Sequence, residues 1–256
     1  MAPRNSTPAA GLVWLFDVDG TLTPAQGVVN PAFATWLQAF SREKDMRIVS
    51  GGDRTRILRQ LGRELVANLA VSYNSLGNSV WMNDVEVARL QFEPPRGLTE
   101  LLLSAPELAA YPGRRQGSLS WKNGMLAFSL LGDDATSEER LAYRQFDAQA
   151  RVRQRLADRV MRDFPSLSAQ VAGDTSVDLF PRGKDKSQVL DHIAQPVYFF
   201  ADRTAPGGND HSLAQALHAR NDGSRVFAVD NWEHTWSLLR ELTATVRTQQ
   251  ASALWL

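Results

Sequence analysis

The chain has 256 residues, of which 43% are hydrophobic and 22% charged, and its 28 basic and 28 acidic side chains give a formal net charge of zero. This balance excludes the strong electrostatic attraction of basic proteins to nucleic acids and anionic membranes, and the length allows one large domain or two small ones. The sequence has no cysteine, which excludes disulfides and thiolate chemistry and is typical of a reducing compartment. Residues 1–11 have the composition of a flexible tail and lack a signal peptide, and no apolar run approaches the roughly 18 residues of a membrane span. We therefore expect a cytoplasmic protein.

The first part of the chain alternates predicted strands and helices. The apolar run over residues 12–16 predicts a buried strand that ends at Asp17. Asn30 and Pro31 are typical of a helix start, and the apolar residues that follow have helical spacing. Residues 47–50 predict a second strand, after which Asp53 is placed to cap another helix. Such alternation favours an α/β sheet.

The middle of the chain has a different pattern, which begins near Arg89. Asn123-Gly124 lies between the apolar runs 118–121 and 125–128 and predicts a β-hairpin. Residues 136–139 form a candidate capping box, which predicts one long helix whose apolar face continues to residue 164. Strand-like segments follow around residues 170–171 and 176–180. This block therefore predicts an antiparallel sheet with helices.

The α/β pattern returns after Lys186, with apolar strands over residues 197–200 and 225–229 and a helix that begins near Asn231. The simplest architecture is an open α/β core built from both ends of the chain, residues 12–89 and 185–256. An α+β cap domain, residues 90–184, is then inserted between these two parts of the core.

Two carboxylates follow the first predicted strand. Asp17 and Asp19 are alternate residues of an extended segment, so they face one side, beyond the strand end where α/β sheets bind ligands. Two close carboxylates repel each other unless a cation or proton lies between them, which favours a magnesium site. An EF-type calcium loop requires a preceding helix and Glu at its twelfth position, whereas a strand precedes this segment and Val28 occupies that position. A plain turn is the remaining alternative.

These residues belong to a recognisable motif. Residues 16–23, Phe-Asp-Val-Asp-Gly-Thr-Leu-Thr, resemble the first motif of the haloacid dehalogenase superfamily. Three later segments, 122–126, 176–181 and 198–211, are similar to the eukaryotic-type phosphomannomutases, and the similarity is collinear from about residue 14 to about residue 239. The resemblance implies a Rossmannoid core with a parallel sheet and a cap that sets substrate specificity. It also implies a cytoplasmic phosphohexomutase that interconverts mannose 6-phosphate and mannose 1-phosphate and serves GDP-mannose biosynthesis.

The resemblance implies catalytic roles for four residues. Asp17 is expected to attack phosphorus and form an aspartyl-phosphate, and Asp19 to act as general acid and then base. Ser50 is expected to bond the phosphoryl group, and Lys186 to neutralise the aspartyl-phosphate. For Ser50 the alternative is a turn residue, and for Lys186 a solvated charge at a helix start that Asp185 caps.

Magnesium is the cofactor that the resemblance implies. Its expected ligands are Asp17, the backbone carbonyl of Asp19 and Asp202, with Asp210 in support from outside the first coordination sphere. For Asp210 the alternative is a helix cap after a glycine turn, and both roles are compatible. Asp202 follows a predicted apolar strand, so a purely structural role is the weaker reading.

The resemblance also implies a substrate site that the cap shares with the core. Its expected residues are Lys122, Arg140, Ser176, Asp178 and Asn209. In the family several arginines hold the second phosphate, because the guanidinium fork matches phosphate geometry.

This chain departs from that arginine set. Arg140 matches it, but Lys122 stands where an arginine is expected, Asp133 reverses the charge at a second position, and an arginine expected near Gln26 is absent. Compensation by other cap arginines is open, with candidates Arg114, Arg115 and Arg144.

These departures leave three hypotheses for function. The family resemblance favours the mutase, and the lost arginines favour a magnesium-dependent sugar-phosphate phosphatase with the same aspartyl-phosphate. A non-catalytic binding protein is the third, against which the joint presence of Asp17, Asp19, Lys186 and Asp202 argues. The expected partner is a small sugar phosphate rather than a nucleic acid or membrane, and by analogy a homodimer forms through the cap.

Overall fold

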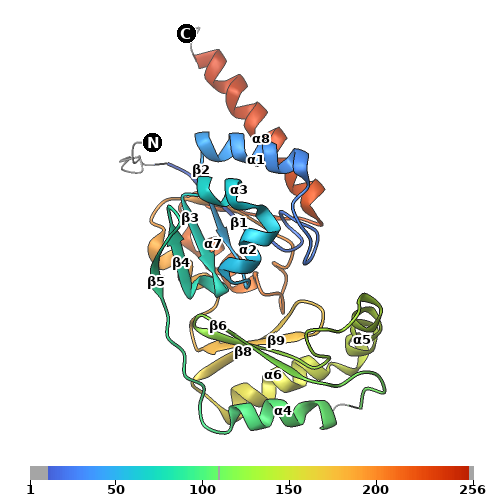
Figure 1. The fold of residues 1–256 in the computed structure, drawn as a ribbon. Coiled ribbons are helices and arrows are strands. Elements are labelled where there is room, and N and C mark those ends of the chain that lie inside the picture. The colour runs from blue at the N-terminus through green and yellow to red at the C-terminus, as the bar shows by residue number, and fades with distance from the viewer. Residues whose placement is uncertain (1–10, 109, 254–256) are drawn as a thin grey trace.

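The computed structural model describes residues 11–108 and 110–253 and contains two β-sheets, one above the other in Figure 1. The larger sheet combines strands from both ends of the chain, and the smaller one is formed by the middle of the chain. This is the α/β core with an inserted α+β unit that the sequence predicts. Residues 1–10 of the expected flexible tail lie outside the described residues.

The larger sheet has seven strands in the order β11-β10-β1-β2-β3-β4-β5. The strands from β11 to β3 are parallel, and β4 and β5 extend the sheet as an antiparallel edge. Sequence patterns predicted β1, β2, β10 and β11 but not the three others. The strand bounds are β1 Val13–Phe16, β2 Asp45–Val49, β3 Val71–Asn74, β4 Ser79–Met82, β5 Val85–Arg89, β10 Val197–Ala201 and β11 Arg225–Ala228.

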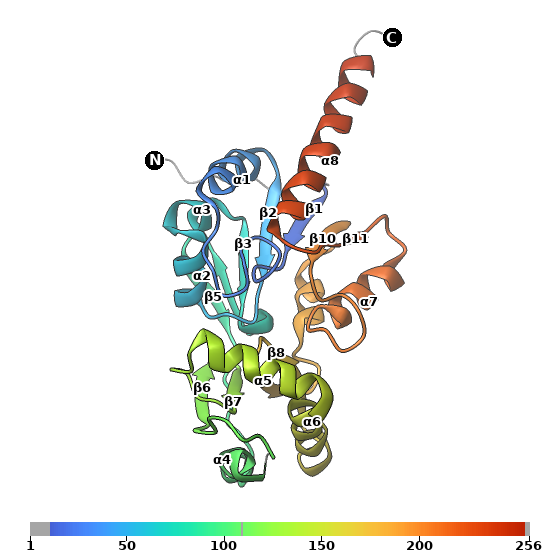
Figure 2. The same cartoon turned by 90° about the vertical axis from the view of Figure 1, so that its right-hand side faces the viewer.

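Helices cover both faces of this sheet (Figure 2). Trp14 and Phe16 of β1 pack in one cluster with α1, α2, α3 and α8, whereas Val13 and Leu15 pack in another with η2 and α7. Both faces of β1 and β10 face such clusters, and both strands consist of aliphatic and aromatic residues, which is typical of strands buried on two sides. No described helix is long and apolar enough to cross a membrane. The helix bounds are α1 Pro31–Glu43, α2 Arg54–Leu61, α3 Arg63–Asn68, η1 Ser75–Gly77, η2 Lys186–His192, α7 His211–Arg220 and α8 Trp232–Ala253.

Two predicted helix starts in the core are confirmed by their hydrogen bonds. Asn30 Oδ1 accepts from the backbone N–H groups of Ala32 and Phe33, and Pro31 occupies the first helical position. Asp53 Oδ1 accepts from the backbone N–H of Arg56 at 2.8 Å. Both caps satisfy donors that the first turn of a helix leaves unpaired.

The smaller sheet is antiparallel, with strand order β6-β7-β9-β8. Asn123-Gly124 joins β6 and β7 in the predicted hairpin, and the capping box at Thr136 and Glu139 is present. Figure 1 shows α4 and α6 on the side of this sheet away from the core, so its other face is turned toward the larger sheet. The bounds are α4 Leu98–Leu108, β6 Ser118–Lys122, β7 Met125–Ser129, α5 Ser137–Ala150, α6 Val152–Asp163, β8 Leu167–Ala172 and β9 Ser176–Pro181.

The prediction of one long helix after residue 136 is wrong. The chain forms two helices, α5 and α6, separated by Arg151 in the left-handed conformation with φ 50° and ψ 38°. Buried Asp147 near the end of α5 accepts from the backbone N–H of Arg153 at 3.0 Å and from its Nε at 2.7 Å, which fixes the start of α6. Apolar spacing continues across the break because both helices pack in the same core cluster.

Candidate active site

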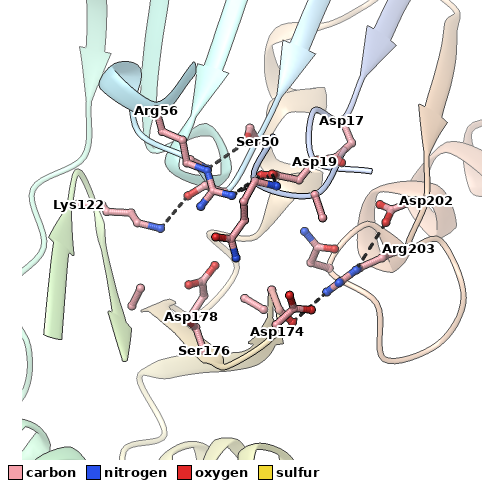
Figure 3. Close-up of a pocket in the computed structure, with 18 residues that line it drawn as sticks. Asp17, Asp19, Ser50, Arg56, Lys122, Asp174, Ser176, Asp178, Asp202 and Arg203 are labelled. Carbon is pink, nitrogen blue, oxygen red and sulfur yellow. Dashed lines mark hydrogen bonds and ion pairs between the residues drawn. The ribbon is translucent and has the colours of Figure 1, made fainter. Parts of the chain in front are cut away.

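The candidate site lies at the carboxyl ends of the parallel strands. Asp17 follows β1, Ser50 follows β2 and Asp202 follows β10, and β1 lies between the other two strands. β2 and β3 lie on one side of β1, whereas β10 and β11, from the end of the chain, lie on the other. The strand order therefore reverses at β1, and such a topological switch point is where α/β sheets bind ligands. Figure 3 shows the cleft between this edge and the smaller sheet, which encloses about 800 Å³ including space open to solvent.

A buried cluster of opposite charges lies at the base of this cleft. Lys186 Nζ donates to Asp17 Oδ1 and to Asp210 Oδ1, each at 2.6 Å. Lys186 is the first residue of η2 and is fully buried, so the alternative of a solvated charge is wrong. Asp185 does cap η2, because its Oδ1 accepts from the backbone N–H of Ser187 at 2.8 Å. The cap of η2 thereby fixes the start of the helix that carries Lys186 into the site.

Charge balance at Asp17 is set by opposing effects. The pKa of its carboxyl is raised to about 8, because burial, together with Asp210 and Asp202, outweighs the lowering by Lys186. Burial lowers the pKa of Lys186, but the charges of Asp17 and Asp210 outweigh burial and raise it. A carboxylate must be ionised to attack phosphorus, so this site requires more positive charge than Lys186 alone provides.

Three carboxylates are arranged so that they fit a metal ion. Asp17, Asp202 and Asp210 each offer an oxygen within 4.8 Å of the others. Asp210 Oδ2 and Asn209 Oδ1 are buried and bond to no described residue, although buried polar atoms normally have a partner. A hard divalent cation such as Mg²⁺, with its bound waters, satisfies such oxygens. Asp210 occupies the cap position of α7 but makes no capping bond, so its carboxylate serves the cluster.

Asp19 faces a different set of partners from Asp17. Its Oδ1 accepts from the backbone N–H of Gln26 at 2.7 Å and from Gln60 Nε2 at 2.9 Å. Arg56 Nη2 donates to Oδ1 at 2.9 Å and to Oδ2 at 2.8 Å. Burial raises the pKa of Asp19, but Arg56 and the hydrogen bonds from Gln26 and Gln60 outweigh burial and hold the pKa below its usual value. Sequence analysis missed Arg56, although its position in the first turn after Gly51-Gly52 directs it toward the strand ends.

Ser50 is buried beside the cleft, and its Oγ accepts from the backbone N–H of Gly52 at 3.0 Å. The hydroxyl closes a turn, as the alternative reading expects, and it also lines the cleft; its contact with a phosphoryl group stays a prediction. Its own proton is available to an acceptor in the cleft.

The cap contributes one wall of the cleft. Lys122 extends from the β6–β7 hairpin and donates to the backbone carbonyl of Gly51 at 3.0 Å. Ser176 and Asp178 on β9 also line the cleft. Burial raises the pKa of Asp178, while Lys122 and Arg56 lower it. The structure thus brings three of the predicted substrate residues to the cleft, and Asn209 lines the opposite, core wall.

Arg140 is not brought to this cleft. Its guanidinium bonds the carbonyls of Ala135 and Asp133 and the hydroxyl of Thr175, and Arg140 is absent from the cleft lining. Asp133 is also outside the lining and accepts from Ser118.

The three candidate replacements among the cap arginines also lie outside the lining: Arg114, Arg115 and Arg144. Arg114 bonds the carbonyl of Leu131, and Arg144 pairs with Asp174 at 3.7 Å. Within the described residues, the basic side chains that line the cleft are Arg56, Lys122 and Arg203.

A parallel sheet with an inserted cap, and paired acidic residues at the end of its central strand, define the haloacid dehalogenase fold. A haloacid dehalogenase-like hydrolase from Bacteroides thetaiotaomicron superposes with a TM-score of 0.53 at 13% identity, over 80% of this chain and 85% of that one. At this identity the likeness shows the fold alone.

The eukaryotic phosphomannomutase family model matches residues 33–242, and the chain belongs to this family. The phosphomannomutase of Saccharomyces cerevisiae is 30% identical over 240 residues, which cover 89% of this chain and 92% of the yeast protein. A probable phosphomannomutase of Caenorhabditis elegans is 30% identical over 254 residues, which cover 93% and 99%.

Proposed function

We propose that this protein is a phosphomannomutase that interconverts mannose 6-phosphate and mannose 1-phosphate through an aspartyl-phosphate at Asp17. The observation that carries the proposal is the buried contact of Lys186 with Asp17 and Asp210. This contact lies beside Asp202 at the base of a cleft of which the cap forms one wall. Membership of the family and the names of its relatives support the choice of a mannose phosphate.

In the first half-reaction Asp17 attacks the phosphorus of a sugar bisphosphate. The bond between phosphorus and the sugar oxygen breaks as the bond to the Asp17 carboxylate forms. Asp19 gives a proton to the leaving oxygen, which requires that its ion pair with Arg56 be open so that the carboxyl can hold that proton. Lys186 offsets the charge of the carboxylate before attack and of the phosphoryl oxygens afterwards. The Ser50 hydroxyl donates a hydrogen bond to a phosphoryl oxygen.

The second half-reaction transfers the phosphoryl group from Asp17 to the free hydroxyl of a hexose monophosphate and regenerates the sugar bisphosphate. Asp19, now ionised, takes the proton of the incoming hydroxyl, whose oxygen attacks the phosphorus and releases the Asp17 carboxylate. Lys122, Ser176, Asp178 and Asn209 would bind the sugar and its second phosphate as it presents either end.

We propose Mg²⁺ as the cofactor, held by Asp17, Asp202 and the backbone carbonyl of Asp19, with Asp210 in support. When bound, it supplies charge neutralisation at the phosphoryl oxygens. The acidic groups of the cleft make this charge necessary, because an anionic substrate does not enter a site with excess negative charge. Three basic side chains line the cleft, whereas five aspartates do: Asp17, Asp19, Asp174, Asp178 and Asp202.

A sugar-phosphate phosphatase is the alternative that one observation favours. Lys122 is the single basic side chain that the described part of the cap contributes to the cleft lining. A weakly held second phosphate lets the bisphosphate escape, and water then takes the phosphoryl group from Asp17.

One incubation separates these functions. The purified protein is mixed with Mg²⁺, mannose 1-phosphate and a trace of glucose 1,6-bisphosphate, and mannose 6-phosphate and free phosphate are followed together. Mannose 6-phosphate with little free phosphate supports the mutase, and free phosphate without mannose 6-phosphate supports the phosphatase. Neither product points to a different sugar phosphate, and a panel of sugar phosphates is then the next assay.

Further proposals concern organisation. We propose boundaries at residues 89/90 and 184/185 between core and cap, a cytoplasmic location, and a role in GDP-mannose biosynthesis.

We also propose a homodimer through the cap, which the exposed apolar side chains of Leu103, Trp121 and Leu141 support. Light scattering of the eluted protein measures its mass. A monomer mass at high as well as at low protein concentration contradicts the dimer.

A further inference from the structure

The carboxylate of Asp19 is occupied by donors from the core. Three donors reach Oδ1, namely the Gln26 N–H, Gln60 Nε2 and Arg56 Nη2. Oδ2 accepts from Arg56 alone among the described residues. A general base must accept a proton from water or from a sugar hydroxyl. In this arrangement Arg56 occupies Oδ2, the oxygen of Asp19 that could otherwise accept such a proton.

Arg56 is placed so that a substrate can displace it. It lines the cleft, and 32% of its side chain is exposed, as is 29% of that of Asp19. Ion pairs at this exposure contribute little to stability, so exchanging the carboxylate for another anion is inexpensive. A phosphate group is a strong competitor, because a guanidinium binds phosphate with charge-assisted hydrogen bonds.

A second cation lies on the same glycine loop. Lys122 Nζ is 3.0 Å from the Gly51 carbonyl, and a Cβ built on Gly52 would lie 3.1 Å from Arg56 Cδ. Figure 3 shows Arg56 and Lys122 directed into the cleft from the core and the cap, on the side away from Asp202. An anion that enters beside this loop therefore meets a guanidinium and an ammonium together. This arrangement differs from a site made of cap arginines, since Arg140 is engaged elsewhere.

We propose that Arg56 holds Asp19 unreactive while the cleft contains no substrate, and releases it when the second phosphate of a hexose phosphate binds Arg56 and Lys122. The proposal rests on the proposed function and concerns how the reactivity of Asp19 is regulated in that function. Hydrolysis of the aspartyl-phosphate requires the water oxygen to bond phosphorus, the phosphorus bond to Asp17 to break, and the water proton to pass to Asp19. With Asp19 bound to Arg56, that proton has no acceptor, so the phosphoenzyme waits for a sugar. Arg56 is thus a positioning residue that sets the partition between transfer to sugar and transfer to water.

The first test measures the lifetime of the phosphoenzyme. The protein is labelled at Asp17 with ³²P from glucose 1,6-bisphosphate, the sugar is removed, and loss of label is followed in Mg²⁺. We expect Arg56→Gln to shorten the lifetime by about tenfold or more and to increase free phosphate per mannose 6-phosphate formed. Arg56→Lys, which keeps the charge, should restore much of the lifetime. Arg59→Gln, a change at an exposed arginine of the same helix, is the matched control and should match wild type.

The second test uses the wild-type protein, so it does not depend on how a variant folds. Inorganic phosphite, an oxyanion that cannot accept the phosphoryl group as a sugar does, should displace Arg56 and speed the loss of label. The same addition should leave the already rapid loss from Arg56→Gln unchanged. An unchanged lifetime in Arg56→Gln, or no effect of phosphite on wild type, overturns the proposal.

Failure of the proposed function has a different result. A wild-type protein that releases phosphate at every turnover is not a mutase, yet a shorter lifetime in Arg56→Gln still supports the role of Arg56. A wild-type protein that never becomes labelled refutes both proposals.

Discussion

Replacing Lys186 by Met removes the charge that two buried carboxylates share. The side chain of Lys186 is fully buried, as is that of Asp210, and Asp17 is 3% exposed. Met has a similar length but no N–H donor, so Asp17 Oδ1 and Asp210 Oδ1 each lose a contact of 2.6 Å. Removing one partner of a buried ion pair costs about 3–5 kcal/mol. At about 2–4 °C per kcal/mol for a chain of this size, Tm should fall by about 6–20 °C.

The sign of the pH dependence follows from the charges. The pKa of Asp17 is raised to about 8, because burial outweighs the lowering by Lys186. Without Lys186 this pKa rises further, and an acid with a raised folded pKa loses stability as pH increases through that value. The difference in Tm between Lys186→Met and wild type should therefore be larger at pH 8 than at pH 5.

Calorimetry in EDTA at both pH values measures this difference. Lys184→Met is the matched control, because Lys184 lies two positions away, is not buried and does not line the cleft. A Tm for Lys186→Met within about 2 °C of wild type at pH 8 would refute the reasoning that Lys186 compensates both carboxylates.

Three other predictions concern the same site. Asp17→Asn should abolish labelling by sugar bisphosphate and lower isomerisation by at least about 10³-fold, as measured by trapping of the phosphoenzyme; residual labelling would place the nucleophile elsewhere. Because burial raises the pKa of Asp17 from 3.8 to about 8, metal-free protein should lose stability as pH rises through this range, and urea titrations should show that Mg²⁺ reduces the loss; parallel curves with and without Mg²⁺ would contradict this. Gly20→Ala places a Cβ 2.4 Å from Asp202 Oδ2, on a residue whose φ is +83°. The substitution should therefore raise the Mg²⁺ concentration for half-maximal activity and cost about 1–3 kcal/mol of stability. An unchanged Mg²⁺ dependence would separate Asp202 from the metal site.

Local signals predicted the helix starts. Asn30, Asp53 and Thr136 each cap a helix through a backbone N–H two or three residues away, so the whole interaction lies within a short segment of sequence. The end of α5 depends instead on Asp147 and Arg153, whose pair is stabilised by burial in the folded cap. The apolar pattern contains no sign of that break.

The same distinction applies to the site. Asp17 and Asp202 could be placed from sequence, because each follows an apolar strand and parallel strands end at one edge of the sheet. Arg56 bonds a carboxylate 37 positions earlier in the chain, and that contact depends on how α2 packs over the sheet. Arg140 matches the family motif, yet its guanidinium bonds the cap backbone in this structure. A motif specifies the residue type but not the direction of a long side chain.

The pairing of β1 with β10 bears on synthesis. Val13 lies opposite Val197, so one edge of the central strand has no partner until most of the chain has left the ribosome. At typical rates of elongation this interval is on the order of 10–40 s. During it, a strand as apolar as residues 13–16 exposes unpaired backbone groups, a known hazard for aggregation. The inserted cap therefore delays completion of the core, and expression at reduced temperature or with chaperones should raise the yield of folded protein.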